Sequence, residues 1–252
     1  MRLPAGKKPN LIALLLAALA FLCLPGLLAF AQAGTLPSSK RSDTAYADTR
    51  PRLEQELTAA GLQLGNRIFL RITKEPAELT AYVEDAKGVY EVFRTWPVCA
   101  ASGTLGPKLR EGDGQAPEGF YEIAPVQMNP SSDYHLSFNL GFPNAYDRAN
   151  GRTGSFLMVH GNCVSIGCFA MTDPVLDEIW TLMQAAFENG QTRVPVHIFP
   201  FPMTEANLSA HAGSENAAFW TELAPGWTTF ETTGKVPKVS VSGRSYRVGA
   251  TQ

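Results

Sequence analysis

The sequence contains few of the residues that carry metal, redox or nucleic-acid chemistry. Its 252 residues include only 4 cysteines and 4 histidines, and the formal net charge is −2. A nucleic-acid-binding protein needs a basic face, which this balance does not supply. The chain also has no G-x-S-x-G elbow, no phosphate-binding glycine loop and no obvious glycosidase-like pair of carboxylates. These absences argue against serine hydrolases, nucleotide-binding proteins and glycosidases.

The cysteines also lack the paired Cys-x-x-Cys spacing of most structural zinc sites. A zinc hypothesis would have to combine His160 with Cys163, Cys168 and Cys99, and we do not favour it. We expect no metal and no cofactor.

The first 33 residues have the pattern of a secretory signal peptide. Arg2, Lys7 and Lys8 precede an uncharged apolar segment at 11–24, and Ala31-Gln32-Ala33 gives a small-x-small cleavage site. This pattern predicts cleavage after Ala33 and export to the periplasm, with no stable membrane insertion afterwards. An uncleaved anchor is the alternative, because the apolar region would just span a bilayer. The proline-glycine break within that region favours cleavage.

Three cysteines lie beyond the predicted signal peptide, namely Cys99, Cys163 and Cys168. In an oxidising compartment, an odd number of cysteines indicates a free thiol. Two pairings remain open at this point. A Cys99–Cys163 disulfide would leave Cys168 free, whereas a Cys163–Cys168 disulfide would consume a candidate nucleophile.

Strand-like alternation of apolar residues dominates the middle of the chain. Strands are predicted at residues 67–72, 79–83, 89–98, 119–123, 156–159 and 194–199. A helix is predicted to begin at Thr172 or Asp173, with Pro174 in its first turn, and to end at Asn189-Gly190. The predicted fold class is therefore mostly β with flanking helices, an α+β protein.

The two ends of the chain give weaker patterns. Polar residues 34–49 predict a flexible lead-in, which a short helix over 52–60 follows. A helix near 214–223 and a strand-like basic tail over 235–248 are predicted beyond Pro202. We expect four parts: a signal peptide at 1–33, a lead-in with a short helix at 34–65, a catalytic domain at 66–202 and a C-terminal extension at 203–252.

The segment from His160 to Asp173 is the strongest functional signal. His160 lies eight positions before Cys168, which ends a Ser165-Ile166-Gly167-Cys168 turn. A thiolate is the attacking species, and an imidazole can take the thiol proton near neutral pH. Small residues around the thiol leave backbone N–H groups for an oxyanion. A helix beginning nearby is expected to lower the thiol pKa. The alternatives are a buried structural thiol and a hydrogen-bonded core histidine.

Two other histidines lie in different contexts. His135 belongs to the long connection at 125–154, which is rich in aromatic and turn-forming residues, and long connections in compact domains are usually functional. We expect His135 to contact substrate. His197 alternates with Val196 and Ile198, so we expect it on a strand face with a structural role.

The segment 160–173 resembles the motif of the L,D-transpeptidase (YkuD-type) catalytic domain, and it is most similar to the YafK-like branch. That motif has the form His-Gly-x-Cys-x-Ser-x-Gly-Cys-x-Ala-Met-Thr-Asp. Further matching segments lie at 116–121, 127–132 and 139–144, and the resemblance spans roughly residues 66–202.

The resemblance implies a mixed, sandwich-like β fold with a cysteine nucleophile. By this resemblance, Cys168 is the catalytic cysteine and His160 the histidine that activates it. The Gly161 carbonyl would orient the imidazole, and N–H groups near Gly167 and Cys168 would hold the oxyanion. Ser165 and His135 complete the set of candidate orienting or substrate-binding residues.

The chain departs from the wider family at two positions. Ile166 stands where the family has a second histidine, and Ala170 stands where it has an arginine. That arginine would normally hold a substrate carboxylate, so these departures indicate a changed substrate.

We therefore expect an exported cysteine acyl-transfer enzyme of cell wall biogenesis and cell shape. It would act on peptidoglycan stem peptides at the L-centre of meso-diaminopimelate, through a Cys168 thioester. It would work either as an L,D-transpeptidase or as a hydrolase that releases peptidoglycan-linked outer-membrane lipoprotein. The alternative is a non-catalytic peptidoglycan-binding or structural module, stabilised by a metal or disulfide.

Overall fold

The computed structural model describes residues 1–2 and 36–251. Nearly all of the predicted signal peptide, at residues 3–33, lies outside the described residues. Within the described residues, no helix is both long enough and apolar enough to cross a membrane.

Two five-stranded mixed sheets form the centre of the molecule. The first sheet has the order β3-β2-β1-β10-β5, and only β1 and β10 run parallel. Its strands are β1 (Ile68–Thr73), β2 (Glu78–Glu84), β3 (Tyr90–Pro97), β5 (Gly119–Ile123) and β10 (Val194–Phe199). All five match strands predicted from the sequence.

The second sheet has the order β4-β9-β8-β7-β6 and much shorter strands. These are β4 (Ala100–Ala101), β6 (Met128–Asn129), β7 (Ser137–Asn139), β8 (Met158–His160) and β9 (Phe169–Ala170). Strands β8 and β9 run parallel, and the other pairs are antiparallel. Strand β8 begins two residues later than predicted, because Phe156 is exposed and has a φ of 52°.

The central strands of the first sheet, β1 and β10, are buried on both faces. Ile68, Leu70 and Ile72 of β1 point into the larger core, which they share with residues of the second sheet and of helix α3 (Asp173–Glu188). Phe69, which points to the opposite face, packs with Phe230 of helix α5 (Ala217–Thr233). Strands covered on both sides read as nearly continuous apolar runs.

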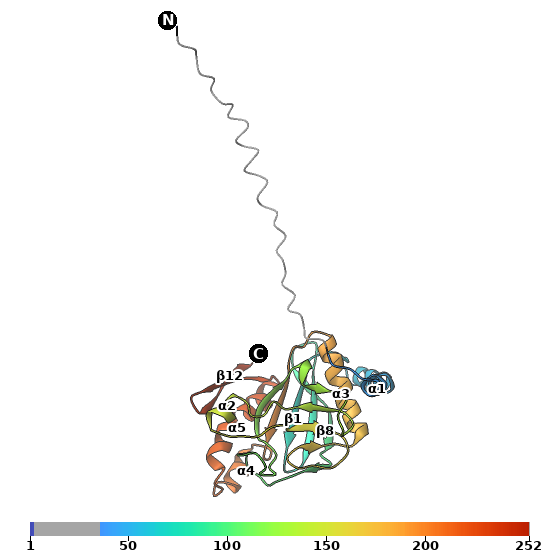
Figure 1. The fold of residues 1–252 in the computed structure, drawn as a ribbon. Coiled ribbons are helices and arrows are strands. Elements are labelled where there is room, and N and C mark those ends of the chain that lie inside the picture. The colour runs from blue at the N-terminus through green and yellow to red at the C-terminus, as the bar shows by residue number, and fades with distance from the viewer. Residues whose placement is uncertain (3–35, 252) are drawn as a thin grey trace. The chain divides into compact units, whose positions relative to one another are not determined.

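Helix α1 (Lys40–Ala59) lies against α3 (Figure 1). The prediction of a flexible lead-in up to residue 49 was wrong, because residues 40–49 are the start of this helix. Ser39 and Ser42 form a reciprocal capping box at its N-terminus. Such a cap stabilises a helix whose first turns are polar. Ala45 and Leu53 are buried on the inner side.

The C-terminal extension covers the opposite face of the first sheet. It consists of α4 (Glu205–Ala210), α5, and a hairpin of β11 (Pro237–Ser242) and β12 (Ser245–Thr251). Trp220, Leu223 and Trp227 of α5 form a second core with Phe120 and Phe199 of the sheet. The predicted helix continues ten residues further than expected, to Thr233, and the predicted strand-like tail is the hairpin.

The connection at 125–154 folds into short elements. They are the 3-10 helix η1 (Pro125–Gln127), strands β6 and β7, and helix α2 (Ala145–Ala149). Two mixed sheets with flanking helices confirm the predicted α+β class with a mixed β-sandwich core.

Candidate active site

Strands β8 and β9 pair in parallel, and this pairing brings together the segments that contain the two candidate catalytic residues, His160 and Cys168. Val159 lies opposite Phe169 and His160 opposite Ala170. Cys168 directly precedes β9, so it lies beside the start of β8, and the Met158 N–H donates to its Sγ at 3.4 Å. Strands about 4.8 Å apart, with two residues spanning about 6.6 Å, place Cys168 and His160 roughly 8 Å apart at the backbone. In the described structure the Cys168 Sγ is hydrogen-bonded to the Met158 N–H and the Phe156 carbonyl, and not to His160.

Cys168 has a free thiol with intermediate exposure. Its Sγ donates to the Phe156 carbonyl at 3.7 Å. Burial raises the pKa of the Cys168 thiol above its ordinary value, although the Met158 N–H and the charge of Lys108 act in the opposite direction. The expectation that a helix start lowers this pKa was wrong, because β9 separates Cys168 from α3.

His160 is buried, with 4% of its surface exposed. Its Nδ1 lies 2.6 Å from the Gly161 carbonyl oxygen. A carbonyl oxygen only accepts, so Nδ1 carries the hydrogen and Nε2 keeps the lone pair that a general base needs. The ring of Tyr134 lies 4.9 Å from the imidazole, centroid to centroid, at a tilt of 41°.

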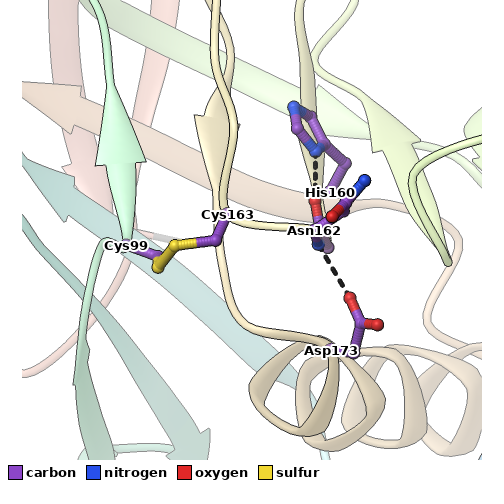
Figure 2. Close-up of a disulfide and its surroundings, with 6 residues drawn as sticks. Cys99, His160, Asn162, Cys163 and Asp173 are labelled. Carbon is purple, nitrogen blue, oxygen red and sulfur yellow. Dashed lines mark hydrogen bonds between the residues drawn. A yellow bond between two sulfur atoms is a disulfide. The ribbon is translucent and has the colours of Figure 1, made fainter.

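A disulfide between Cys99 and Cys163 holds the loop that joins β8 to β9 (Figure 2). Of the two pairings that the sequence left open, this is the one that leaves Cys168 free. Both sulfurs are bonded to each other, so they are unavailable as zinc thiolates. On the other side of the loop, Asp173 at the start of α3 accepts from the Asn162 N–H at 2.7 Å.

Backbone strain marks the same loop. Asn162 and Cys163 have φ values of 65° and 40°, which are uncommon for residues with a side chain. Gly161 has no room for a Cβ, which would lie 2.4 Å from Asp173 Oδ1. The disulfide and the Asp173 hydrogen bond therefore hold a conformation that the loop alone would not favour.

Gly167 and Ser165 shape the backbone at the thiol. Gly167 has a φ of 99°, which a glycine adopts easily. The Gly167 N–H donates to the Ser102 hydroxyl, so one amide expected to hold an oxyanion already has an oxygen partner. Ser165 Oγ donates to the Cys168 carbonyl at 2.6 Å.

His135 lies between helices α1 and α3. Its Nε2 is 2.6 Å from Asp177 Oδ1 and its carbonyl accepts from Arg41 at 2.5 Å. A cavity of about 400 Å³ is lined by His135, Asp177 and residues of α1. The residue before it, Tyr134, is the one that contacts His160.

Four residues that were not among the six predicted site residues also lie at this site. Tyr134 packs on the imidazole, Asp173 holds the loop, Ser102 meets Gly167, and Lys108 contributes positive charge at the thiol. Lys108 is itself buried and paired with Asp113 at 2.5 Å. Two of these residues could have been predicted from the sequence, since Tyr134 is next to His135 and Asp173 lies within the motif.

Exposed apolar side chains surround the site. Tyr134, Phe156, Val164 and Ile166 have exposed fractions of 47%, 78%, 52% and 89%. The carbonyl of Phe156 contacts the thiol, and the other three residues lie beside His160 or in the loop leading to Cys168. Large exposed apolar residues that gather at one place are typical of binding surfaces. We call these four residues the apolar rim.

The two mixed sheets, the free thiol and the oriented imidazole define a cysteine-dependent acyl-transfer enzyme. Residues 68–198 match the family described as the L,D-transpeptidase catalytic domain, YkuD. The chain belongs to this family.

Relatives with similar sequences support the assignment. The chain is 45% identical over 185 residues to the protein named "Putative L,D-transpeptidase YafK" of Escherichia coli strain K12. The match covers 73% of this chain and 75% of that protein. The protein of the same name in E. coli O157:H7 matches equally.

Among solved structures, the helical cell shape determining protein Pgp2 (K307A mutant) of Campylobacter jejuni is 21% identical with a TM-score of 0.45. The match covers 77% of this chain and 67% of that one.

Proposed function

We propose that the protein is an exported acyl-transfer enzyme that cleaves or exchanges peptide bonds of peptidoglycan stem peptides through Cys168. The observation that carries this proposal is the free thiol of Cys168 beside the start of β8, the strand that ends at His160, whose Nδ1 is held by the Gly161 carbonyl. The predicted signal peptide and the family's peptidoglycan chemistry support a periplasmic location.

In the proposed reaction, Cys168 Sγ attacks the carbonyl carbon at the L-centre of meso-diaminopimelate while His160 Nε2 takes the thiol proton. The carbonyl π bond opens and its electron pair forms the oxyanion. When the carbonyl re-forms, the C–N bond breaks, and the amine leaves with the proton from His160. The product is a Cys168 thioester, which an amine or water then resolves.

The raised pKa of Cys168 explains why this thiol needs a base. Burial leaves little thiolate at neutral pH, so the proton must leave as the sulfur attacks. The Gly167 N–H is one donor for the oxyanion, once the Ser102 hydroxyl has moved away from it. Ser165 supports this turn by its hydrogen bond to the Cys168 carbonyl.

We further propose that the protein hydrolyses the bond between peptidoglycan and an outer-membrane lipoprotein. The apolar rim supports this choice, because Phe156, Val164 and Ile166 offer more apolar surface than a short, polar stem peptide needs. Ala170 in place of the family's arginine also favours a substrate that differs from the usual one.

Mass spectrometry of digested sacculi tests both levels of this proposal. Lipoprotein-bearing sacculi are incubated with the enzyme or with Cys168→Ala, and free lipoprotein and 3–3 cross-links are followed. Release of lipoprotein by the wild type alone supports hydrolysis. New cross-links without release would refute hydrolysis in favour of transpeptidation, and no change in any bond would favour the non-catalytic peptidoglycan-binding module.

A further inference from the structure

A cavity of about 890 Å³ lies between the edge strand β5, the start of α2 and the C-terminal hairpin. Its lining includes Phe120, Asn144, Val239 and Tyr246, and none of the residues described above at the thiol. A volume of this size accommodates a peptide-sized ligand.

The backbone of β5 is open toward this cavity at Glu122. Glu122 lies opposite Pro195 of β10, and in an antiparallel pair only every second residue directs its N–H and C=O to the neighbouring strand. Phe120, two residues earlier, directs its backbone away from β10. Its N–H donates to the Tyr246 hydroxyl at 3.5 Å, and its carbonyl accepts from Asn144 Nδ2 at 2.9 Å. Because hydrogen-bonding direction repeats every two residues along a strand, the backbone N–H and C=O of Glu122 also point away from β10.

Side chains satisfy both neighbours of Glu122 on this edge. Phe120 is bonded as described, and the Ala124 N–H donates to Gln127 Oε1 at 2.9 Å. Within the described residues, the outward N–H and C=O of Glu122 have no hydrogen-bond partner. An open donor and acceptor on an edge strand is where an extended peptide adds.

The charges around the cavity favour an anion. Arg148 and Arg193 line it, and Glu122 is the one acidic residue of its lining. Arg193 and Glu122 are 3.9 Å apart and both more than half exposed, so this pair leaves the guanidinium accessible. Burial lowers the pKa of His197, also in the lining, to about 3, so its ring is neutral. The formal balance of the lining is therefore positive.

We propose that this cavity is a second ligand site, in which an extended acidic peptide adds to β5 at Glu122 and its carboxylate binds Arg148 and Arg193. The apolar wall of Phe142, Val239 and Tyr246 would pack against the peptide's side chains. The occupant is a peptidoglycan stem peptide, which carries free carboxylates, and this choice rests on the proposed function. The protein would then hold one stem peptide here while Cys168 acts on another.

Binding is measured on protein whose Cys168 has been alkylated with N-ethylmaleimide, so that the catalytic site is blocked. The probes are the stem tetrapeptide L-Ala-D-Glu-meso-diaminopimelate-D-Ala and the same peptide with its carboxylates amidated. We expect the acidic peptide to bind to the wild type. Affinity should fall by about tenfold or more when the peptide is amidated, and by a similar factor when the acidic peptide is offered to the Arg148→Glu/Arg193→Glu variant. Hydrogen exchange of the Glu122 amide should slow when the acidic peptide is present.

Arg247→Glu is the matched control, because Arg247 is exposed on the same hairpin but does not line the cavity. It should bind the peptide like the wild type. Loss of all binding on alkylation, equal binding by the charge-reversed variant, or an unprotected Glu122 amide would each overturn the second site. Turnover of the tetrapeptide's parent substrate by unmodified wild type is measured separately, and it decides the proposed function whatever the binding result.

Discussion

The two sheets have the same number of strands but are held together differently. In the first sheet, strands of five to eight residues form long ladders, and β1 and β10 are almost fully buried. In the second, strands of two or three residues carry the imidazole of His160 and adjoin the thiol of Cys168. The loop between them is held by the Cys99–Cys163 disulfide and by the hydrogen bond from the Asn162 N–H to Asp173. We infer that the first sheet supplies stability and the second supplies reactivity.

The sharpest way to separate these roles is to remove the reacting groups. Cys168→Ser and His160→Ala should each reduce turnover by about a thousandfold or more, because the two groups act as one unit. The thermal midpoint should change little, since neither change opens a large cavity. Turnover is followed by release of muropeptide products, and substantial activity in Cys168→Ser would contradict the mechanism.

The disulfide is the point at which stability and reactivity meet. It closes a loop with a sequence separation of 64, so by the chain-entropy account Cys99→Ser/Cys163→Ser should lower the free energy of unfolding by about 4 kcal/mol. Denaturant unfolding measures this loss, and activity per folded molecule should fall as well.

Leu70→Ala in β1 is the comparison for the disulfide variant. It should cost about 2 to 5 kcal/mol of stability because Leu70 is fully buried, while activity per folded molecule stays the same. Equal loss of activity per folded molecule in both variants would remove the distinction between the sheets.

The pH dependence of alkylation tests the environment of the thiol. Thiolate is the reactive form, and burial raises the pKa of Cys168, so reaction with iodoacetamide should be slow at neutral pH. The rate should rise about tenfold per pH unit, without a plateau until the pH passes the ordinary thiol pKa. A plateau near neutral pH would mean that His160 and Cys168 form an ion pair in the free enzyme. The control is the same measurement on Cys168→Ala, with both proteins prepared without residues 1–33 and therefore without Cys23, and this variant should not react.

Ser102 gives the smallest expected effect. Its hydroxyl competes with substrate for the Gly167 N–H, so Ser102→Ala should raise kcat/KM by a few-fold, about the value of one hydrogen bond. Ser131→Ala, at an exposed serine outside the site, is the control. A fall in kcat/KM for Ser102→Ala alone would mean that the hydroxyl helps to position the turn.

Sequence patterns identify the first sheet better than the second. Alternation is visible in β1, β2, β3, β5 and β10 because the strands are long enough to show a period. Strands of two residues, such as β4 and β6, have no period to detect. The first turns of α1 were missed because its polar residues are stabilised by a cap and by packing on α3, which composition does not show.

The candidate site likewise contains residues that the sequence predicts and residues that only the structure reveals. Cys168, His160, Gly161 and Gly167 are adjacent in a motif, so the sequence predicts them together, although their catalytic roles stay a prediction. Ser102 is 65 positions from its partner Gly167, and no local pattern connects the two. Only the folded chain brings such residues together.

The buried thiol has a consequence for the lifetime of the enzyme. Oxidants such as peroxide attack thiolates, so a cysteine that stays protonated ages slowly even where disulfides form freely. Under the proposed mechanism, the raised pKa of Cys168 would keep the thiol protonated until substrate is bound and His160 acts as base. If the protein is exported as proposed, we expect this thiol to stay reduced without a reducing system to repair it.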